Sequence, residues 1–314
     1  MSAALPFRTL GPWMQATFGR PVHRVALDAG STCPNRDGTK GYGGCTYCDV
    51  EGSGTGALKT GASLEEQLDR GLERIQRRAP EVGALAYFQS YTNTYVDGAR
   101  FAEVLDVVAR RIGAADGRPP IVAVSVATRP DCLPDEALAA LARLNARVPV
   151  WVELGLETAD DGVLLAINRL HTLAEFHSAA RRVRALGLLT VGHAILGLPG
   201  DGREGARRTA EALAEAQVDG VKVHHLMVLA RTQLAHQWRR GEVEVLDPAT
   251  YVAWLADFVE RLGPAQVLHR ITGDAEPGKL LAPLWPIHKN EVRRLLAEEL
   301  ARRGTAQGSL HALR

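Results

Sequence analysis

The sequence predicts an α/β fold with a parallel sheet, either a β/α barrel or a doubly wound sheet. Short apolar segments alternate with longer helical patterns, and six such units fit in about 210 residues, the period of these folds. The segment "IVAVSVATRPD" is too uniformly apolar for a half-exposed strand and suits a buried parallel one. Polar and glycine residues also gather after the predicted strands, where β/α barrels build their active sites.

The individual elements follow in chain order. Apolar or β-branched runs predict strands within residues 22–30, 84–91, 121–131, 148–158, 188–200 and 220–229. Apolar residues at helical spacing predict helices at 63–79, 101–112, 135–145, 173–186 and 204–216. The first of these helices begins with Ser63 as N-cap and acidic residues in its first turn, which favours that boundary.

The C-terminal part differs in pattern from the rest. Helical patterns at 248–262 and 287–303 flank a loop rich in Pro and Gly, "ITGDAEPGKLLAPLWP". We therefore expect a core of residues 1–232, with a cysteine-containing loop at 33–48, and a mainly helical extension of residues 233–314. Such an extension can cap a barrel, but it is too short for an independent acyltransferase domain.

The composition of the 314-residue chain indicates a folded globular protein. Hydrophobic residues make up 46% of the chain, enough for a substantial core, and the net charge of +1 points to no particular class of partner. There is no apolar run suited to a signal peptide or a membrane span. We expect a cytoplasmic protein without membrane contact.

Three of the four cysteines lie in the run "CPNRDGTKGYGGCTYC", at Cys33, Cys45 and Cys48. A structural zinc site uses four closed ligands, usually in two close pairs, whereas this loop has one close pair and one distant partner. A 4Fe-4S cluster held by three thiolates leaves one iron open to an external chelating molecule. The glycines of the loop allow the backbone to wrap a bulky cluster, and Tyr47 is placed to contact a bound nucleoside.

With these residues in view, the chain resembles the radical S-adenosylmethionine (SAM) superfamily, and most closely its Elongator-like branch, which contains the YhcC and YtqA proteins. The resemblance rests on the cysteine loop together with "YFQSYTNTY", "TRPDCLPD", "ELGLET", "GHAILGLPG" and "VKVHHLMVL". The first cysteine gap of eleven residues departs from the commonest superfamily spacing of three and is similar to the Elongator-like branch.

The resemblance implies an incomplete (β/α)6 barrel, a 4Fe-4S cluster on the three cysteines, and SAM chelating the fourth iron. It also implies an electron donor such as flavodoxin or ferredoxin and cleavage of SAM to a 5′-deoxyadenosyl radical. The SAM contacts it implies are Gln89, Ser90, Arg129, Glu153, Gly192, Gly197 and Gly200, with backbone near 227–229 at the adenine. Its suggested substrate is a tRNA, at the wobble uridine.

Several assignments have a structural alternative. Arg129 can instead pair with Asp131 to fix a loop, and Glu153 can instead belong to a polar layer inside the barrel. Cys132 suits either a reactive thiol or an ordinary buried cysteine. At the level of function, the alternative to a radical SAM enzyme is a zinc-stabilised, non-catalytic nucleic-acid-binding module completed by Cys132 or a histidine.

Overall fold

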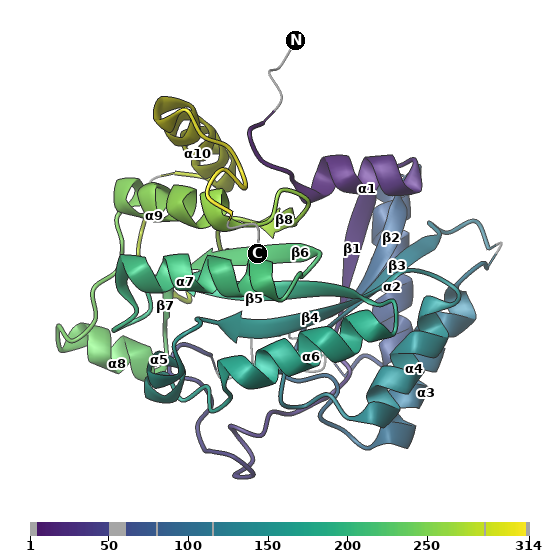
Figure 1. Cartoon of the computed structure of the whole chain (residues 1–314). Coiled ribbons are helices and arrows are strands. Elements are labelled where there is room, and N and C mark those ends of the chain that lie inside the picture. Colours follow the sequence, from purple (N-terminus) through teal and green to yellow (C-terminus); the bar gives the residue numbers. More distant parts are fainter. Residues whose placement is uncertain (1–4, 50–60, 80, 115, 286, 312–314) are drawn as a thin grey trace.

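The computed structural model describes residues 5–49, 61–79, 81–114, 116–285 and 287–311. Seven parallel strands curl into a half-barrel in the order β1-β2-β3-β4-β5-β6-β8, with helices packed around them (Figure 1). The strands are β1 (Val22–Leu27), β2 (Gly83–Phe88), β3 (Ile121–Thr128), β4 (Val150–Glu157), β5 (Leu189–Leu196), β6 (Gly220–His225) and β8 (Val267–Arg270). The partial β/α barrel predicted from the sequence is confirmed.

Ten helices in the described ranges accompany the strands. They are α1 (Leu10–Phe18), α2 (Leu64–Arg78), α3 (Gly98–Arg111), α4 (Asp135–Asn145), α5 (Asp161–Ala166), α6 (Leu173–Ala185), α7 (Gly202–Glu215), α8 (Gln233–Arg239), α9 (Pro248–Arg261) and α10 (Lys289–Arg303). Helix α2 begins with a capping box between Ser63 and Glu66, as its sequence predicts. Helix α1 was not predicted, because Gly11 and Pro12 in its first turn weaken the helical pattern.

Alternate residues of the central strands point into the barrel and form layers. The bottom layer is apolar and packs against Met14 and Trp13 of α1; its strand residues are Leu85, Ala123, Trp151 and Val191. The middle layer is polar and contains Tyr87, Ser125, Glu153, His193 and Lys222. The layer nearest the carboxyl ends of the strands contains Gln89, Ala127, Gly155, Ile195 and His224. Helix α1 therefore closes the barrel below its polar interior.

The C-terminal part is mainly helical, as expected, and it also contributes two short strands. β8 pairs with β6 in parallel and becomes the seventh strand, while β7 (Val228–Leu229) and β9 (Leu280–Ala282) form a separate antiparallel pair. With four residues, β8 is too short to show a period in the sequence. The domain boundary expected at residue 232 stays a prediction.

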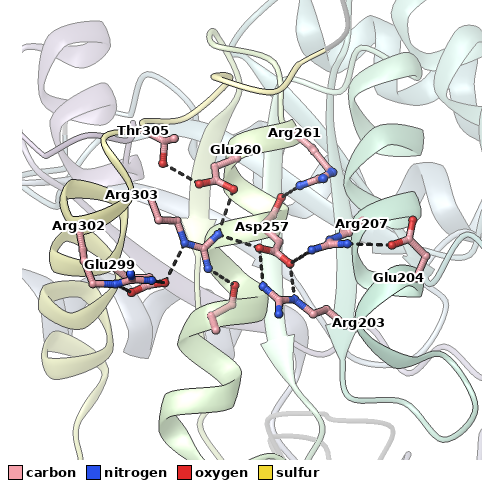
Figure 2. Close-up of polar contacts among 11 residues, drawn as sticks. Arg203, Glu204, Arg207, Asp257, Glu260, Arg261, Glu299, Arg302, Arg303 and Thr305 are labelled. Carbon is pink, nitrogen blue, oxygen red and sulfur yellow. Dashed lines mark hydrogen bonds and ion pairs between the residues drawn. The ribbon is translucent and has the colours of Figure 1, made fainter.

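An ion-pair network ties the C-terminal helices to the barrel. Helix α9 lies between α7 and α10 (Figure 1), and Asp257 of α9 contacts three arginines from its two neighbours (Figure 2). The distances from Asp257 are 2.6 Å to Arg203, 2.9 Å to Arg207 and 2.7 Å to Arg303. Burial would raise the pKa of Asp257, but these guanidinium groups outweigh burial and lower it. The network fixes α10 to the barrel through α9.

No helix in the described ranges combines the length and apolarity needed to cross a bilayer.

Candidate active site

A cavity of about 340 Å³ opens at the carboxyl ends of the strands, lined by all three clustered cysteines and by inward-facing strand residues. Its size is at the lower end of the range for small-molecule sites. Of the residues predicted to hold the cluster or SAM, the structure brings seven to this cavity: Cys33, Cys45, Cys48, Tyr47, Gln89, Arg129 and Glu153. Met227 and Leu229, expected near the adenine, also line it.

The cysteine loop is folded tightly by its own backbone. The N–H of Cys48 donates to the carbonyl of Cys45 at 3.0 Å, and the N–H of Arg36 donates to the carbonyl of Cys33 at 2.8 Å. Gly44 has a positive φ of 82°, and a Cβ there would lie 2.8 Å from Nη2 of Arg36. A glycine is therefore needed at this position for the arginine to lie against the loop.

Nitrogen donors surround two of the three sulfur atoms. Nη2 of Arg36 lies 3.3 Å from Sγ of Cys48, while Nδ2 of Asn35 and Nη1 of Arg169 lie 3.7 and 3.9 Å from Sγ of Cys45. Burial and the neighbouring Cys45 raise the pKa of Cys48 to about 11, against the opposing effect of Arg36. Cationic donors of this kind stabilise sulfur ligands that become thiolates when a metal centre binds.

The donor set fits a cluster better than a single ion. Within the described ranges, no three His, Cys, Asp or Glu side chains lie close enough to hold one metal ion. The three thiolates of a 4Fe-4S cluster bind separate irons, so they do not have to meet at one point. Cys132, the proposed fourth zinc ligand, lines a different hollow beside Asp131 and Lys40. The three thiols, of which Cys33 and Cys45 are buried, and their N–H donors therefore fit the cluster predicted from the sequence.

Glu153 lies at the centre of the polar layer. Its carboxylate is 2.5 Å from Nζ of Lys222 and also accepts hydrogen bonds from three neighbours: Tyr87 at 3.1 Å, Ser125 at 2.5 Å and His193 at 2.8 Å. Burial would raise its pKa, but Lys222 and His193 outweigh burial and hold the pKa well below its usual range. Because both oxygens are engaged, the structure favours the alternative in which Glu153 belongs to the polar layer.

Arg129 shows the predicted pairing with Asp131 and also keeps one unused donor. Its Nε and Nη2 lie 2.9 and 2.8 Å from the Asp131 carboxylate, and Lys40 binds the same carboxylate at 2.5 Å. The Nη1 atom of Arg129 is buried and has no hydrogen-bond partner. The loop therefore fixes the guanidinium, and Arg129 is one of the residues that line the cavity.

Four predicted SAM-contact residues are not among the residues that line the cavity: Ser90, Gly192, Gly197 and Gly200. Gly192 points outward, where a Cβ would lie 2.2 Å from Leu213 of α7, so its small size serves helix packing. This packing gives no support to a nucleoside contact at Gly192, which stays a prediction. Gly197 and Gly200 have positive φ values of 92° and 83° and shape the turn after β5. Ser90 is completely buried behind β2.

The sequence did not single out several charged residues of the cavity. Arg169 forms an ion pair with Glu157 at 3.4 Å and donates to the carbonyl of Gly155 at 2.9 Å. A Cβ at position 155 would lie 2.3 Å from Nη2 of Arg169, so the glycine in "ELGLET" makes room for this arginine. Lys222 could have been found from strand alternation, because it shares the parity of His224 in "VKVHH". No comparable signal marks Arg169.

Comparison with protein families gives two matches. The radical SAM superfamily matches residues 32–213, and the radical SAM C-terminal domain matches residues 218–302. The chain is 38% identical over 302 residues to YtqA of Bacillus subtilis (strain 168), covering 96% of this chain and 92% of that protein. This similarity extends through both family matches.

Two further similarities are more distant. The structure of Elp3 from the archaeon Methanocaldococcus infernus superposes with a TM-score of 0.70 at 16% identity, covering 91% of this chain and 64% of that one. A tRNA uridine(34) acetyltransferase of Methanocaldococcus jannaschii is 29% identical over 124 residues, 38% of this chain and 22% of that protein. The first similarity concerns the fold alone.

Proposed function

The chain belongs to the radical SAM superfamily, and from this premise we propose that it is an enzyme that uses a 4Fe-4S cluster and SAM to modify a substrate. The observation that carries the proposal is the convergence of Cys33, Cys45 and Cys48 on one cavity with strand residues of the barrel. When bound there, the cluster supplies the electron that cleaves SAM to methionine and a 5′-deoxyadenosyl radical. The electron would come from a flavodoxin or ferredoxin in the cytoplasm.

In this proposal the three cysteines hold the cluster, and nearby cations support them. Arg36 and Arg169 donate toward the sulfur atoms and balance their negative charge. Tyr47, Gln89 and Arg129 line the same cavity and are the SAM contacts we retain from the sequence. The free Nη1 donor of Arg129 suits a carboxylate, since a guanidinium donor prefers an anionic acceptor.

The enzymatic proposal has a direct test. Protein purified without oxygen should be brown, absorb near ~410 nm and contain iron and sulfide without stoichiometric zinc. After reduction it should convert SAM to 5′-deoxyadenosine. A colourless protein with one zinc per chain would support the zinc-stabilised nucleic-acid-binding module instead.

For the substrate we propose a tRNA base, with wobble uridine as the specific candidate. The support is the similarity to a tRNA uridine(34) acetyltransferase, which covers 38% of this chain. A tRNA would be held mainly through phosphates. A plot of the logarithm of its association constant against the logarithm of the salt concentration should therefore have a slope of roughly −1 for each phosphate neutralised. An anticodon-loop base would also leave its stack more readily than one in a duplex stem.

Two measurements test the substrate. Bulk tRNA is titrated into the reconstituted protein at several salt concentrations, and modified nucleosides are compared between wild-type and deletion strains. Steep salt dependence together with a missing or accumulated nucleoside supports the proposal. If tRNA does not bind at low salt and the nucleoside profiles coincide, the substrate is a small molecule or a protein.

A further inference from the structure

The middle layer of the barrel carries more positive than negative charge. Lys222 of β6 and Arg270 of β8 are register partners, so both stand on the same side of the barrel. Arg24 of β1 approaches from the other edge of the sheet, with its Cζ 6.0 Å from the centre of the Tyr87 ring, and Nζ of Lys222 lies 4.3 Å from that centre. The sheet therefore brings three cationic side chains toward one tyrosine.

Only one of these cations has an anionic partner among the described residues. Lys222 pairs with Glu153 at 2.5 Å. The guanidinium groups of Arg24 and Arg270 have no side-chain hydrogen bond or ion pair in the described part of the chain. Two acids act on Arg270 from nearby without pairing with it: Asp274, which lies 3.9 Å from Nζ of Lys289, and Glu153, which pairs with Lys222.

The pKa of Arg270 agrees with the lack of an anionic partner. Burial lowers its pKa most, and the charge of Arg24 lowers it further, which outweighs the opposing effects of Tyr87, Asp274 and Glu153. His224 adds no further positive charge, because burial and then Arg270 lower its pKa well below the usual value and keep it neutral. Two unpaired guanidinium groups repel one another here, and an anion between them would remove that repulsion.

We propose that the cavity wall at Arg270, near the exposed side chain of Arg24, binds an anionic group of the substrate, a carboxylate or a phosphate. Arg270 lines the same cavity as the cysteines, and its planar fork suits two-point binding of either group. This inference rests on the proposed function, since it assumes that the cavity takes a substrate. It places the anionic group of the substrate beside β8, away from Arg129.

The experiment measures stabilisation by simple anions. The melting temperature of the anaerobically reconstituted protein, saturated with SAM, is recorded in sodium phosphate, sodium acetate and sodium chloride at equal ionic strength. Variants R270Q and R24Q are compared with R143Q, which removes an exposed arginine that has no ion pair among the described residues. The R143Q control corrects for net charge, and chloride corrects for ionic strength.

The binding anion should raise the melting temperature of wild type and R143Q by about 2 to 4 °C more than that of R270Q and R24Q, at a tenfold excess over its Kd. Phosphate and acetate are separate arms, so the stronger one identifies the group. R270Q should also melt at a higher temperature than wild type when no such anion is present, because an unpaired buried charge has been removed.

Two outcomes overturn the inference. Equal shifts in all four proteins would mean a general salt effect without a site. A shift that occurs without SAM and disappears when SAM is added would assign the arginines to the SAM carboxylate. The proposed function is tested separately. Anion binding without 5′-deoxyadenosine formation would support the anion site and contradict the proposed enzymatic activity. Formation of 5′-deoxyadenosine without anion binding would support the activity and contradict the anion site.

Discussion

Replacing Glu153 with glutamine should destabilise the protein by removing the anionic partner of Lys222. Lys222 is almost completely buried, with 5% of its side chain exposed, and the carboxylate of Glu153 is the only one within ion-pair distance of it in the described residues. Glutamine keeps the shape of the side chain but carries no charge. The buried ammonium group then faces Tyr87 and a neutral amide.

The expected cost follows from burial. Removing one partner of a buried ion pair costs about 3–5 kcal/mol, which for a chain of this size lowers the melting temperature by roughly 6–10 °C. Lys222 limits the cost by losing its proton. In the wild type, burial lowers the pKa of Lys222 to about 8, while the carboxylate opposes that shift. Without Glu153 the pKa of Lys222 should fall further.

The direction of the pH effect follows from proton counting. Above the folded pKa, the unfolded chain binds one proton at Lys222 that the folded chain does not, since the unfolded pKa is about 10.4. Stability therefore rises with pH by about 1.4 kcal/mol per unit in that window. For wild type the rise begins near pH 8, where the folded pKa lies. For E153Q it should begin below pH 8.

The assay compares melting temperatures from pH 6.5 to 9 for wild type, E153Q, and E153Q combined with K222M. The double variant removes both charges and should recover most of the lost stability. SAM affinity is measured in parallel. If E153Q loses SAM affinity with little change in stability, and K222M does not restore it, Glu153 is a SAM contact and our assignment to the polar layer is wrong.

Three further predictions concern other parts of the chain. Changing any one of the three clustered cysteines to alanine should abolish iron retention and SAM cleavage together, while C132A keeps both; full activity in one of the first three would remove that residue from the site. D257N should lower the free energy of unfolding by about 2 kcal/mol near pH 7, because three arginines lose a shared partner. That difference should shrink below about pH 4, where the wild-type carboxylate becomes protonated in the unfolded chain, and a pH-independent difference would argue against the ion pairs. G192A should cost about 1–3 kcal/mol through contact with Leu213 and leave SAM affinity unchanged, and a selective loss of SAM affinity would return Gly192 to the cofactor site.

The fold could be predicted because its dominant signal is local. Six buried parallel strands leave six apolar runs, and the helices between them carry their own caps and periodicity. The seventh strand gave no such signal, since β8 has four residues and pairs with β6 across helices α8 and α9. Its place in the sheet depends on tertiary contacts that a local pattern does not contain.

For the candidate site, too, local features could be predicted from the sequence and features that depend on tertiary contacts could not. Cysteine spacing is a local property, and the loop at 33–48 was assigned from it directly. The role of Gly192 could not be assigned from its motif, because the face on which a strand residue lies depends on register. The partners of Glu153 come from strands β2, β3, β5 and β6 and lie 28 to 69 residues from it in the sequence. Only the folded sheet shows that its oxygens are occupied.

The two ends of the cavity come from different parts of the chain. The cysteine loop follows β1, whereas Arg270 ends β8, in the region assigned from sequence to the extension. Because β8 is held against β6 and followed by a loop that reaches the cavity at Asp274, Glu276 and Lys279, the C-terminal region forms part of the wall. Changes in that region can therefore alter which substrate enters while the cysteine end is preserved. On this basis, replacing Arg270 should affect substrate binding far more than iron content, and replacing a clustered cysteine should do the reverse.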